Sequence, residues 1–158
     1  MEEKKISESA VEIAQLMMPA NANPVGNVHG GTIMKIIDEA AGIAALRHSH
    51  KNCVTASVDK IDFISPVFIG NLVIAKASIN YVSKTSMEIG VRVESENIKS
   101  GEKKHVASAY LTFVALDARN RPTEIPNIIL ETDEQKRRYD EAKRRREYRI
   151  KNRVRQEH

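Results

Sequence analysis

The sequence predicts an α+β domain in which a curved antiparallel sheet wraps a long buried helix, followed by a basic helical tail. Three observations predict this class. One segment is typical of a helix that is apolar on nearly all sides, and four later runs alternate with the period of two that strands require. The loops between those runs are short, which favours antiparallel neighbours. We place the domain at residues 1–130 and the tail at residues 131–158.

The helix is expected from Thr32 to about His48, after an Asn-, Pro- and Gly-rich loop that ends in His29-Gly30-Gly31. Few charges interrupt it before its last turn: Lys35, Asp38 and Glu39. A helix this apolar is normally buried. One sheet is too small to cover all of its sides, so we expect a second copy of the chain to cover the rest and form a homodimer.

The strands are expected both before and after this helix in the sequence. Residues 11–18 form a short extended or mixed segment that ends at Pro19, and the other strands follow the helix. Four sets of alternating apolar residues mark them: Val54, Ala56 and Val58; Val73 to Tyr81; Met87 to Val93; Ala107 to Ala115. Ile61 and Phe63 continue on the other phase, which predicts a bulge near Asp59–Lys60.

The tail contains the whole charge excess of the chain. Residues 1–130 hold 14 basic and 14 acidic side chains, whereas residues 131–158 hold 11 and 7. Thr132 followed by Gln135 fits a capping box, so we expect a protruding helix that frays toward its end. The acids among its bases favour a solvated helix or an oligomer contact over binding to RNA or to an acidic membrane surface.

Composition narrows the possible partners and the compartment. No run approaches the roughly 20 apolar residues of a membrane-spanning helix, and the start of the chain lacks a signal peptide's apolar stretch. Cys53 is the single cysteine, which is compatible with a reducing compartment. Aromatic residues make up only 4% of the chain, too few for the usual stacking on single-stranded nucleic acid. We therefore expect a cytoplasmic protein without membrane insertion or nucleic-acid partner.

Asp38 is the candidate functional acid. A carboxylate in a largely apolar helix is unfavourable unless it is hydrogen-bonded or used in chemistry. The alternative is an ordinary ion pair with Lys35, three residues earlier on the same helix. Glu39, four residues after Lys35, is the better candidate for that pair. From spacing alone, both interpretations of Asp38 are equally open.

The segments NPVGNVHGG (residues 23–31) and MKIIDEAAG (residues 34–42) together resemble the cytosolic acyl-CoA hydrolase branch of the hot-dog thioesterases. That branch includes the bacterial YciA-type enzymes and the two-domain brain acyl-CoA hydrolase of animals. The resemblance continues through VTASVD (residues 54–59), the loop at residues 83–86 and ETDEQK (residues 131–136). It covers about residues 10–145.

The resemblance implies a single hot-dog domain that hydrolyses fatty acyl-CoA to free fatty acid and CoA, with no metal or dissociable cofactor. It implies a dimer, usually assembled as a trimer of dimers, that is, a hexamer. In the animal members one domain supplies an Asn and the other supplies an acid. Those positions fall here on Asn23 and Asp38, so each chain can supply both halves of a shared site. The alternative for Asn23 is an ordinary turn residue before Pro24.

The chemistry needs a base, an oxyanion donor and the exclusion of bulk water. At the helix start, the N–H of Gly31 has no intrahelical partner and suits an oxyanion, although Gly30-Gly31 also fits a simple tight turn. Asp38 lies seven residues later, about 10 Å along the axis, too far to act on the same carbonyl carbon. Gly31 and Asp38 of one site must then come from different chains, with Asp38 as general base or nucleophile.

The phosphates of CoA need cations or N–H groups. We assign Lys84 and Ser86 to this role together with the loop residues His29 and Gly30, while Arg47 and His48 are weaker candidates. His29 could instead orient the loop. His48, His50 and Cys53 match no standard zinc framework, so no metal is expected. Two alternative functions are a non-catalytic acyl-CoA binder and a hot-dog acyl-thioester dehydratase, which characteristically pairs a His with an acid.

Overall fold

The computed structural model describes residues 1–156, with side chains through Arg153. Five long strands form one antiparallel sheet in the order β2-β4-β5-β6-β3: β2 Val11–Leu16, β3 Asn52–Phe63, β4 Leu72–Val82, β5 Ser86–Glu96 and β6 Lys103–Leu116. Two short strands, β1 Lys4–Lys5 and β7 Ile128–Ile129, pair in parallel, and 3-10 turns lie at Ile6–Glu8 and Pro19–Asn21.

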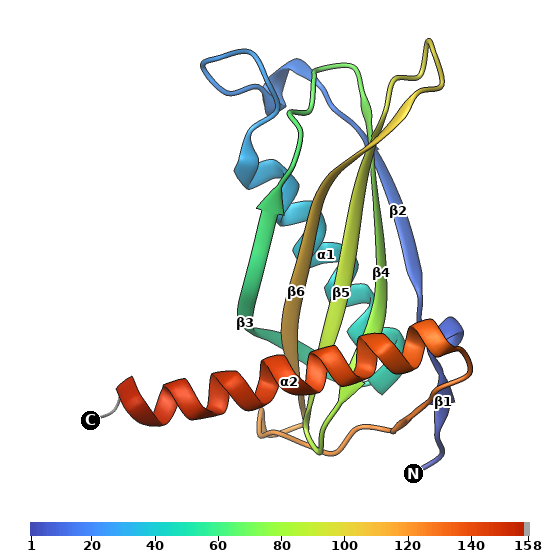
Figure 1. Ribbon diagram of the computed structural model, residues 1–158, viewed down its shortest axis with the longest axis vertical. Helices are drawn as coiled ribbons and strands as arrows, with labels where there is room; N and C mark the ends of the chain where they lie inside the picture. Colours follow the sequence, from blue (N-terminus) through green and yellow to red (C-terminus); the bar gives the residue numbers. More distant parts are fainter. Residues whose placement is uncertain (157–158) are drawn as a thin grey trace.

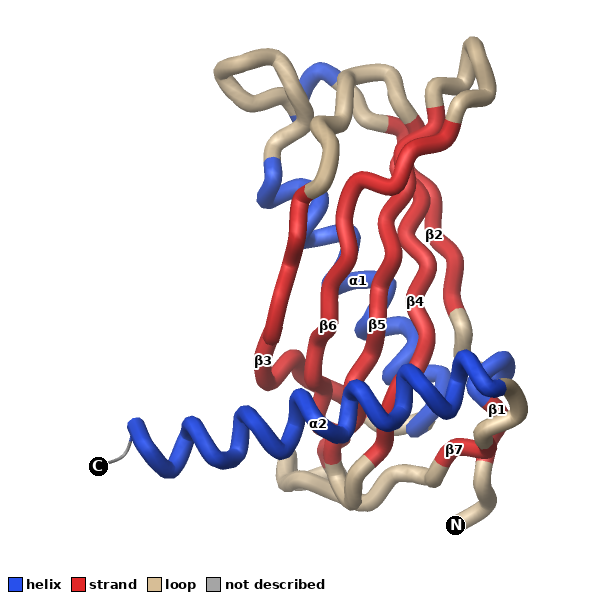
Figure 2. The backbone as a smooth tube through the Cα atoms, in the orientation of Figure 1, coloured by secondary structure: helices blue, strands red, loops and turns tan. Residues whose placement is uncertain are grey.

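Two helices lie on opposite faces of the sheet (Figure 1). Helix α1, Gly30–Ser49, packs against one face, and helix α2, Asp133–Gln156, crosses the other face at a steep angle to the strands. Figure 2 shows the long strands β4, β5 and β6 side by side between the two helices, with β2 and β3 at the edges. The predicted α+β architecture, a sheet wrapped around a long helix with a C-terminal helical tail, is confirmed.

Helix α1 is buried on one side only. It begins two residues before the predicted start and ends one residue after the predicted end, where His50 adopts the left-handed conformation (φ 54°) that stops a helix. Its inner side packs small and branched residues against the sheet: Ile33, Ile36, Ile37, Ala40, Ala41, Ala44 and Ala45. Its outer side exposes apolar side chains that no described part of the chain covers: Met34, Ile43 and Leu46.

Strand β3 lies at the sheet edge, and within residues 1–156 it pairs only with β6. The predicted bulge is confirmed, because the pairing register shifts between Val58 and Lys60; a second shift, between Thr55 and Ser57, was not predicted. Val54 and Val58, predicted to share an apolar face, are 48% and 46% exposed. An edge strand has one neighbour, so its apolar residues lie open wherever α1 does not reach them.

Helix α2 is docked over its first half, whereas the sequence predicts a protruding tail. The capping box is present, since the Gln135 N–H donates to Thr132 Oγ1 at 3.1 Å and the Thr132 N–H donates to Gln135 Oε1 at 3.3 Å. Ala142 is 1% exposed against the sheet, and the Tyr139 ring lies 4.9 Å from that of Tyr81. The later turns extend past the sheet (Figure 1).

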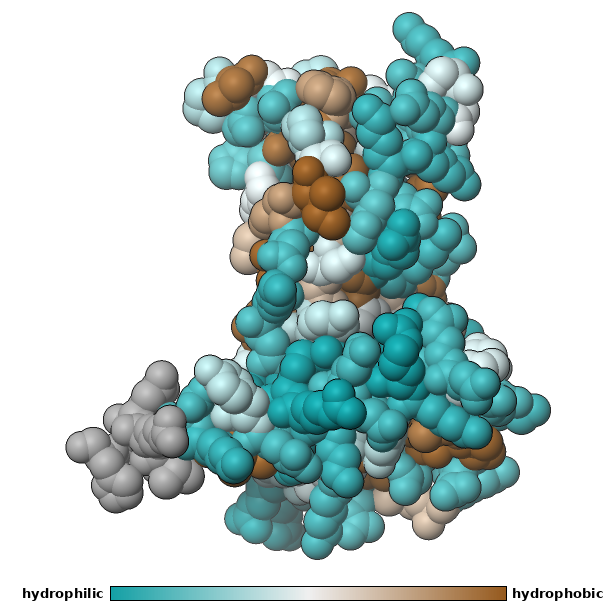
Figure 3. Space-filling view, in the orientation of Figure 1, coloured by the Kyte–Doolittle hydropathy of each residue, from teal (hydrophilic) through white to brown (hydrophobic). Residues whose placement is uncertain are grey.

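The face that carries α2 is largely hydrophilic (Figure 3). Charged side chains of α2 and of the outer sheet surface give this polarity. Across the part of the chain that the structure describes, neither helix is both long and apolar enough to cross a membrane.

Candidate active site

Asp38 and Thr55 form the polar centre of the exposed side of α1. The Thr55 hydroxyl, on β3, donates a hydrogen bond of 2.7 Å to Asp38 Oδ1, and both residues are exposed in the single chain. Lys35 pairs with Glu39 at 3.9 Å and not with Asp38. The ion-pair interpretation therefore applies to Glu39, as its spacing suggested. Asp38 is left with one oxygen held by Thr55 and one oxygen open.

The start of α1 presents unused N–H groups. Thr32 and Ile33 donate their backbone N–H groups to the His29 carbonyl, at 3.0 and 3.4 Å. Among residues 1–156, the N–H groups of Gly30 and Gly31 have no hydrogen-bond acceptor, and the His29 side chain does not cap the helix. These two amides lie at the positive end of the helix dipole, where a developing negative charge is stabilised.

Asn23 forms a turn in the loop before α1. Its Oδ1 accepts hydrogen bonds from the backbone N–H of Val25 (3.0 Å) and of Asn27 (3.1 Å), so the turn interpretation of Asn23 is correct for this oxygen. The Nδ2 group has no acceptor in the described chain, so it remains able to donate. Asn23 lines a pocket of about 320 Å³, together with Gly30 and Phe63.

This pocket is separate from the Asp38 carboxylate within one chain. Its other lining residues are mostly apolar and come from the loop before α1, the start of α1 and the loop after β3: Val28, Ile33, Ile64, Pro66 and Val67. Asp38 lies about two helical turns beyond Gly31, roughly 10 Å along the axis. Asn23 and Gly31 are thus gathered at one end of α1, and Asp38 with Thr55 lies further along it.

Lys84 lies in the turn between β4 and β5 and Ser86 begins β5, at the opposite end of the sheet from the Asn23 loop (Figure 1). The Lys84 ammonium lies 3.9 Å from a Glu124 carboxylate oxygen and its side chain is 80% exposed. The Ser86 and Ser83 hydroxyls are 2.6 Å apart. Within one chain, therefore, the four residues assigned to CoA fall into two separate groups.

His48 is fully buried and is not available to a CoA phosphate, so its assignment as a weaker candidate is wrong. Its Nε2 donates to the Pro126 carbonyl at 2.7 Å, and burial lowers the pKa of the imidazole. Burial also raises the pKa of the neighbouring Cys53 thiol, which lies 3.2 Å from the Ser49 hydroxyl. Within residues 1–156 no three His, Cys, Asp or Glu side chains are arranged to hold a metal ion.

Thr55 is the site residue that the sequence interpretation missed. It lies between Val54 and Ala56 in the alternating run, on the phase opposite to the apolar set. Its position within the VTASVD segment of the resemblance was the available signal. The contact with Asp38 was not predictable, because it depends on the register of β3 with β6 and on the angle at which α1 crosses them.

Residues 25–102 match the family model of the thioesterase superfamily, which has the hot-dog fold. The chain is 39% identical over 137 residues to protein VdlD of Helicobacter pylori, covering 87% of this chain and 78% of that protein. It is 36% identical to the uncharacterized acyl-CoA thioester hydrolase YkhA of Bacillus subtilis, covering 81% and 74%. The cytosolic acyl coenzyme A thioester hydrolase of the rat is also 36% identical, over 91% of this chain and 38% of that longer protein.

Solved structures agree with these relatives. The acyl-CoA hydrolase of Staphylococcus aureus, in complex with butyryl coenzyme A, coenzyme A and coenzyme A disulfide, superposes with a TM-score of 0.90 at 34% identity, covering 98% of this chain and 94% of that chain. An apo-hexameric acyl-CoA thioesterase gives 0.92 at 33% identity, covering 96% and 97%. The S. aureus enzyme was also solved with single Asp, Asn and Thr residues replaced by Ala. This chain belongs to the acyl-CoA thioester hydrolases of the thioesterase superfamily.

Proposed function

We propose that this protein hydrolyses fatty acyl-CoA to free fatty acid and CoA, with Asp38 as the acid that activates water. The observation that carries the assignment is the 2.7 Å hydrogen bond from Thr55 to Asp38 on the exposed side of α1, next to the uncovered apolar side chain of Met34. It fixes the carboxylate orientation and leaves the second oxygen for a water molecule. Membership of the acyl-CoA thioester hydrolases supports the same reaction.

In the proposed reaction the free oxygen of Asp38 takes a proton from water as the water oxygen attacks the thioester carbonyl carbon. The negative charge that develops on the carbonyl oxygen is stabilised by the Gly31 N–H, and the Asn23 amide orients the water. The C–S bond then breaks, and the CoA thiolate leaves with the proton returned from Asp38. A thiol of pKa about 8.5 is a good leaving group, so no second acid is required. Asp38 acting as nucleophile uses the same groups.

We further propose that Asp38 of one chain works with Asn23 and Gly31 of its partner. The separation of about 10 Å along α1 prevents one chain from placing both groups at one carbonyl. The uncovered apolar side chains beside Asp38, Met34 on the helix and Val54 and Val58 on β3, suit burial against a second copy. Burial there would also exclude bulk water from the thioester. The hexameric neighbour supports a trimer of such dimers.

The S. aureus enzyme supports the residue assignment. Its three Ala variants replace an Asn, an Asp and a Thr at the same separations along the chain as Asn23, Asp38 and Thr55. We take these positions as equivalent. This adds Thr55 as a positioning residue that acts through Asp38.

We retain the assignment of His29, Gly30, Lys84 and Ser86 to CoA, with Lys84 and Ser86 supplied by a different chain from the Asn23 loop. The high exposure of Lys84 supports a role in contacting phosphate. We assign the chemistry to residues 1–130 and an accessory role to the extension at residues 131–158. The name of the rat relative supports a cytoplasmic location.

The test measures CoA release from acyl-CoA substrates of several chain lengths by the purified protein and by Asp38→Asn. Replacing the base while keeping its shape is expected to lower turnover by roughly 10²–10⁴-fold, the usual contribution of general base catalysis. Glu39→Gln, one residue away and paired with Lys35, is the matched control and should retain activity. Near-full turnover by Asp38→Asn in an intact oligomer would refute the assignment, and wild-type binding of acyl-CoA without hydrolysis would favour the non-catalytic binder.

A further inference from the structure

A second and larger pocket, which we call the α2 groove, lies on the sheet face opposite α1. It encloses about 640 Å³ between the outer surface of the sheet and the first turns of α2. On the strand face that points toward α2, its base carries small residues: Ser78, Gly90 and Ser108. Neither Asp38 nor the Asn23 loop lines it, so it is distinct from the proposed active site.

The strand register explains the hollow. Ser78 lies directly opposite Gly90, and Gly90 lies opposite Tyr110, so the middle of this cross-strand row has no side chain. A Cβ atom at position 90 would lie 2.8 Å from Asn80 Nδ2. That amide is buried and donates at 3.0 Å to the buried Glu88 carboxylate. Gly90 therefore leaves space both for the groove and for the hydrogen-bonded pair of Asn80 and Glu88 at its end.

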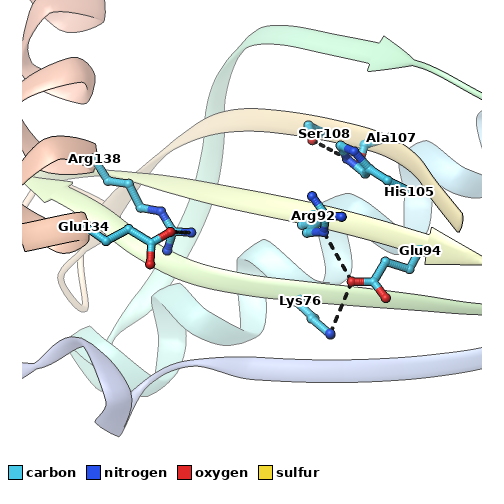
Figure 4. Close-up of polar contacts among 8 residues, drawn as sticks. All are labelled: Lys76, Arg92, Glu94, His105, Ala107, Ser108, Glu134 and Arg138. Atoms are coloured by element: carbon cyan, nitrogen blue, oxygen red, sulfur yellow. Dashed lines mark hydrogen bonds and ion pairs between the residues drawn. The ribbon is translucent and has the colours of Figure 1, made fainter. Parts of the chain in front are cut away.

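The next row places two cations side by side. Lys76 lies directly opposite Arg92, a like-charge pairing that destabilises an antiparallel sheet unless it is compensated. Both cations contact the same oxygen of Glu94, each at 3.2 Å (Figure 4). Burial raises the pKa of Glu94, but the hydrogen bonds from Arg92 and Lys76 outweigh it and lower the pKa overall. One carboxylate is thus shared between two positive charges.

Helix α2 adds three further cations from the other wall: Arg137, Arg138 and Arg145. The Arg138 guanidinium extends from α2 over the sheet, with one nitrogen 2.7 Å from Glu134 (Figure 4). Arg137 contacts Glu141 at 3.4 Å, and Arg145 binds Glu88. The lining therefore contains five cations and two carboxylates, those of Glu12 and Glu141.

Several donor groups remain available. Of the three guanidinium nitrogens of Arg92, only Nε takes part in a hydrogen bond within the described residues, and Arg138 uses only one of its nitrogens. A guanidinium can bind an oxyanion with two parallel N–H groups, which makes Arg the preferred side chain for phosphate. The volume also lies within the range of about 300–1,000 Å³ that is typical of small-molecule sites.

We propose that the α2 groove binds a small phosphorylated anion, with Lys76, Arg92 and Arg138 as its main ligands. The site recognises a pyrophosphate or an organic phosphate, and its cations come from both the sheet and the tail. This role gives the charge excess of residues 131–158 a specific use, because the phosphate would link α2 to the sheet. The proposal does not depend on the hydrolytic reaction.

The test is isothermal titration of the full-length protein with inorganic pyrophosphate. Arg92→Gln and Arg138→Gln should each weaken binding about tenfold or more, since each removes charge-assisted hydrogen bonds. Arg144→Gln is the matched control, because Arg144 is exposed on the same helix, does not line the groove and loses the same charge. It should bind like wild type.

The same variants identify the source of the phosphate. A tenfold loss of CoA affinity in Arg92→Gln assigns the groove to the phosphates of CoA, and unchanged CoA affinity assigns it to another phosphorylated compound. Absence of pyrophosphate binding by wild type would overturn the proposal. That is also the result expected if another copy of the chain covered the groove in the oligomer. Equal loss in Arg144→Gln would also overturn it. If the wild-type protein bound pyrophosphate but did not hydrolyse acyl-CoA, the binding site in the α2 groove would be supported and the proposed function would be refuted.

Discussion

Thr55 on β3 donates a 2.7 Å hydrogen bond to Asp38 on α1, and this contact joins the proposed base to the edge strand of the sheet. In the single chain the pair is exposed to water. A partner chain that covers the neighbouring apolar side chains would lower the local dielectric and strengthen the bond. In the proposed two-chain arrangement, the orientation of the base would therefore depend on the assembly of two chains.

Thr55→Val should lower turnover while preserving the fold, because valine keeps the shape of threonine but cannot orient Asp38. We expect a loss of roughly 10- to 100-fold in kcat, the scale seen when a catalytic group is misplaced. Thr55→Ser restores the hydroxyl and should recover most of the activity. Steady-state kinetics of the two variants measure the difference in kcat. Equal kcat values for both would exclude a positioning role for the hydroxyl.

Mixing two inactive variants tests the shared site. Asn23→Ala and Asp38→Ala each remove one half of every site, but a hybrid dimer contains one site with both halves intact. After subunit exchange, about half of the dimers should be hybrids, and CoA release should reappear. Each variant incubated alone is the control. If exchange is verified by mass and activity stays absent, the two-chain arrangement is wrong.

The buried ion pair between Arg145 and Glu88 should contribute strongly to stability. Two charge-assisted hydrogen bonds, at 2.8 and 2.9 Å, join Arg145 of α2 to the carboxylate of Glu88, which is 3% exposed. Arg145→Ala leaves that carboxylate without its cation and should lower the free energy of unfolding by about 3 kcal/mol. Urea denaturation measures the free energy of unfolding of both variants. Arg144→Ala is the exposed control, and its free energy of unfolding is expected within about 0.5 kcal/mol of wild type. Equal effects of the two would mean that α2 is not held by this pair.

His48 should make the protein less stable as the pH falls. Burial lowers the pKa of His48 from 6.5, and the charges of Lys4 and His50 act in the same direction, against the hydrogen bond to Pro126. Below about pH 6.5 the unfolded chain binds a proton at this histidine that the folded chain does not. Stability is therefore lost as the pH falls from 6.5 toward the lowered pKa of the folded state.

The measurement is the difference in unfolding free energy between pH 7 and pH 5, for wild type and for His48→Gln. The variant removes this titration and should show a smaller decrease than wild type. Glutamine keeps a donor for the Pro126 carbonyl, so the variant is expected to fold. An unchanged decrease would assign the pH dependence to other groups.

Much of the fold was predictable because it depends on local patterns. Apolar residues at helical spacing, glycines before the helix and alternation in the strands predicted α1, the meander β4-β5-β6 and the bulge next to Asp59. The capping box at Thr132 was predictable for the same reason, since it uses residues three apart. These features are determined by near neighbours in the sequence.

Contacts between distant segments were not predictable from those patterns. The exposure of Val54 and Val58 follows from the edge position of β3, which no local pattern specifies. The docking of α2 depends on Glu88 and Ala142, residues far apart in the chain that meet only after the sheet has formed. In the candidate site, the resemblance predicted Asn23 and Asp38, whereas the positioning role proposed for Thr55 rests on its distance to Asp38.

The strand order also has a consequence for the time course of folding. Strands β4, β5 and β6 follow one another in the chain and pair through short turns, whereas β3 pairs with β6 across both β4 and β5. Closing the longer loop has a larger entropic penalty, so β3 should join the sheet after the meander has formed. We expect the contact between Thr55 and Asp38 to become fixed at that step. During refolding, the recovery of thioesterase activity should therefore lag behind the return of strand secondary structure.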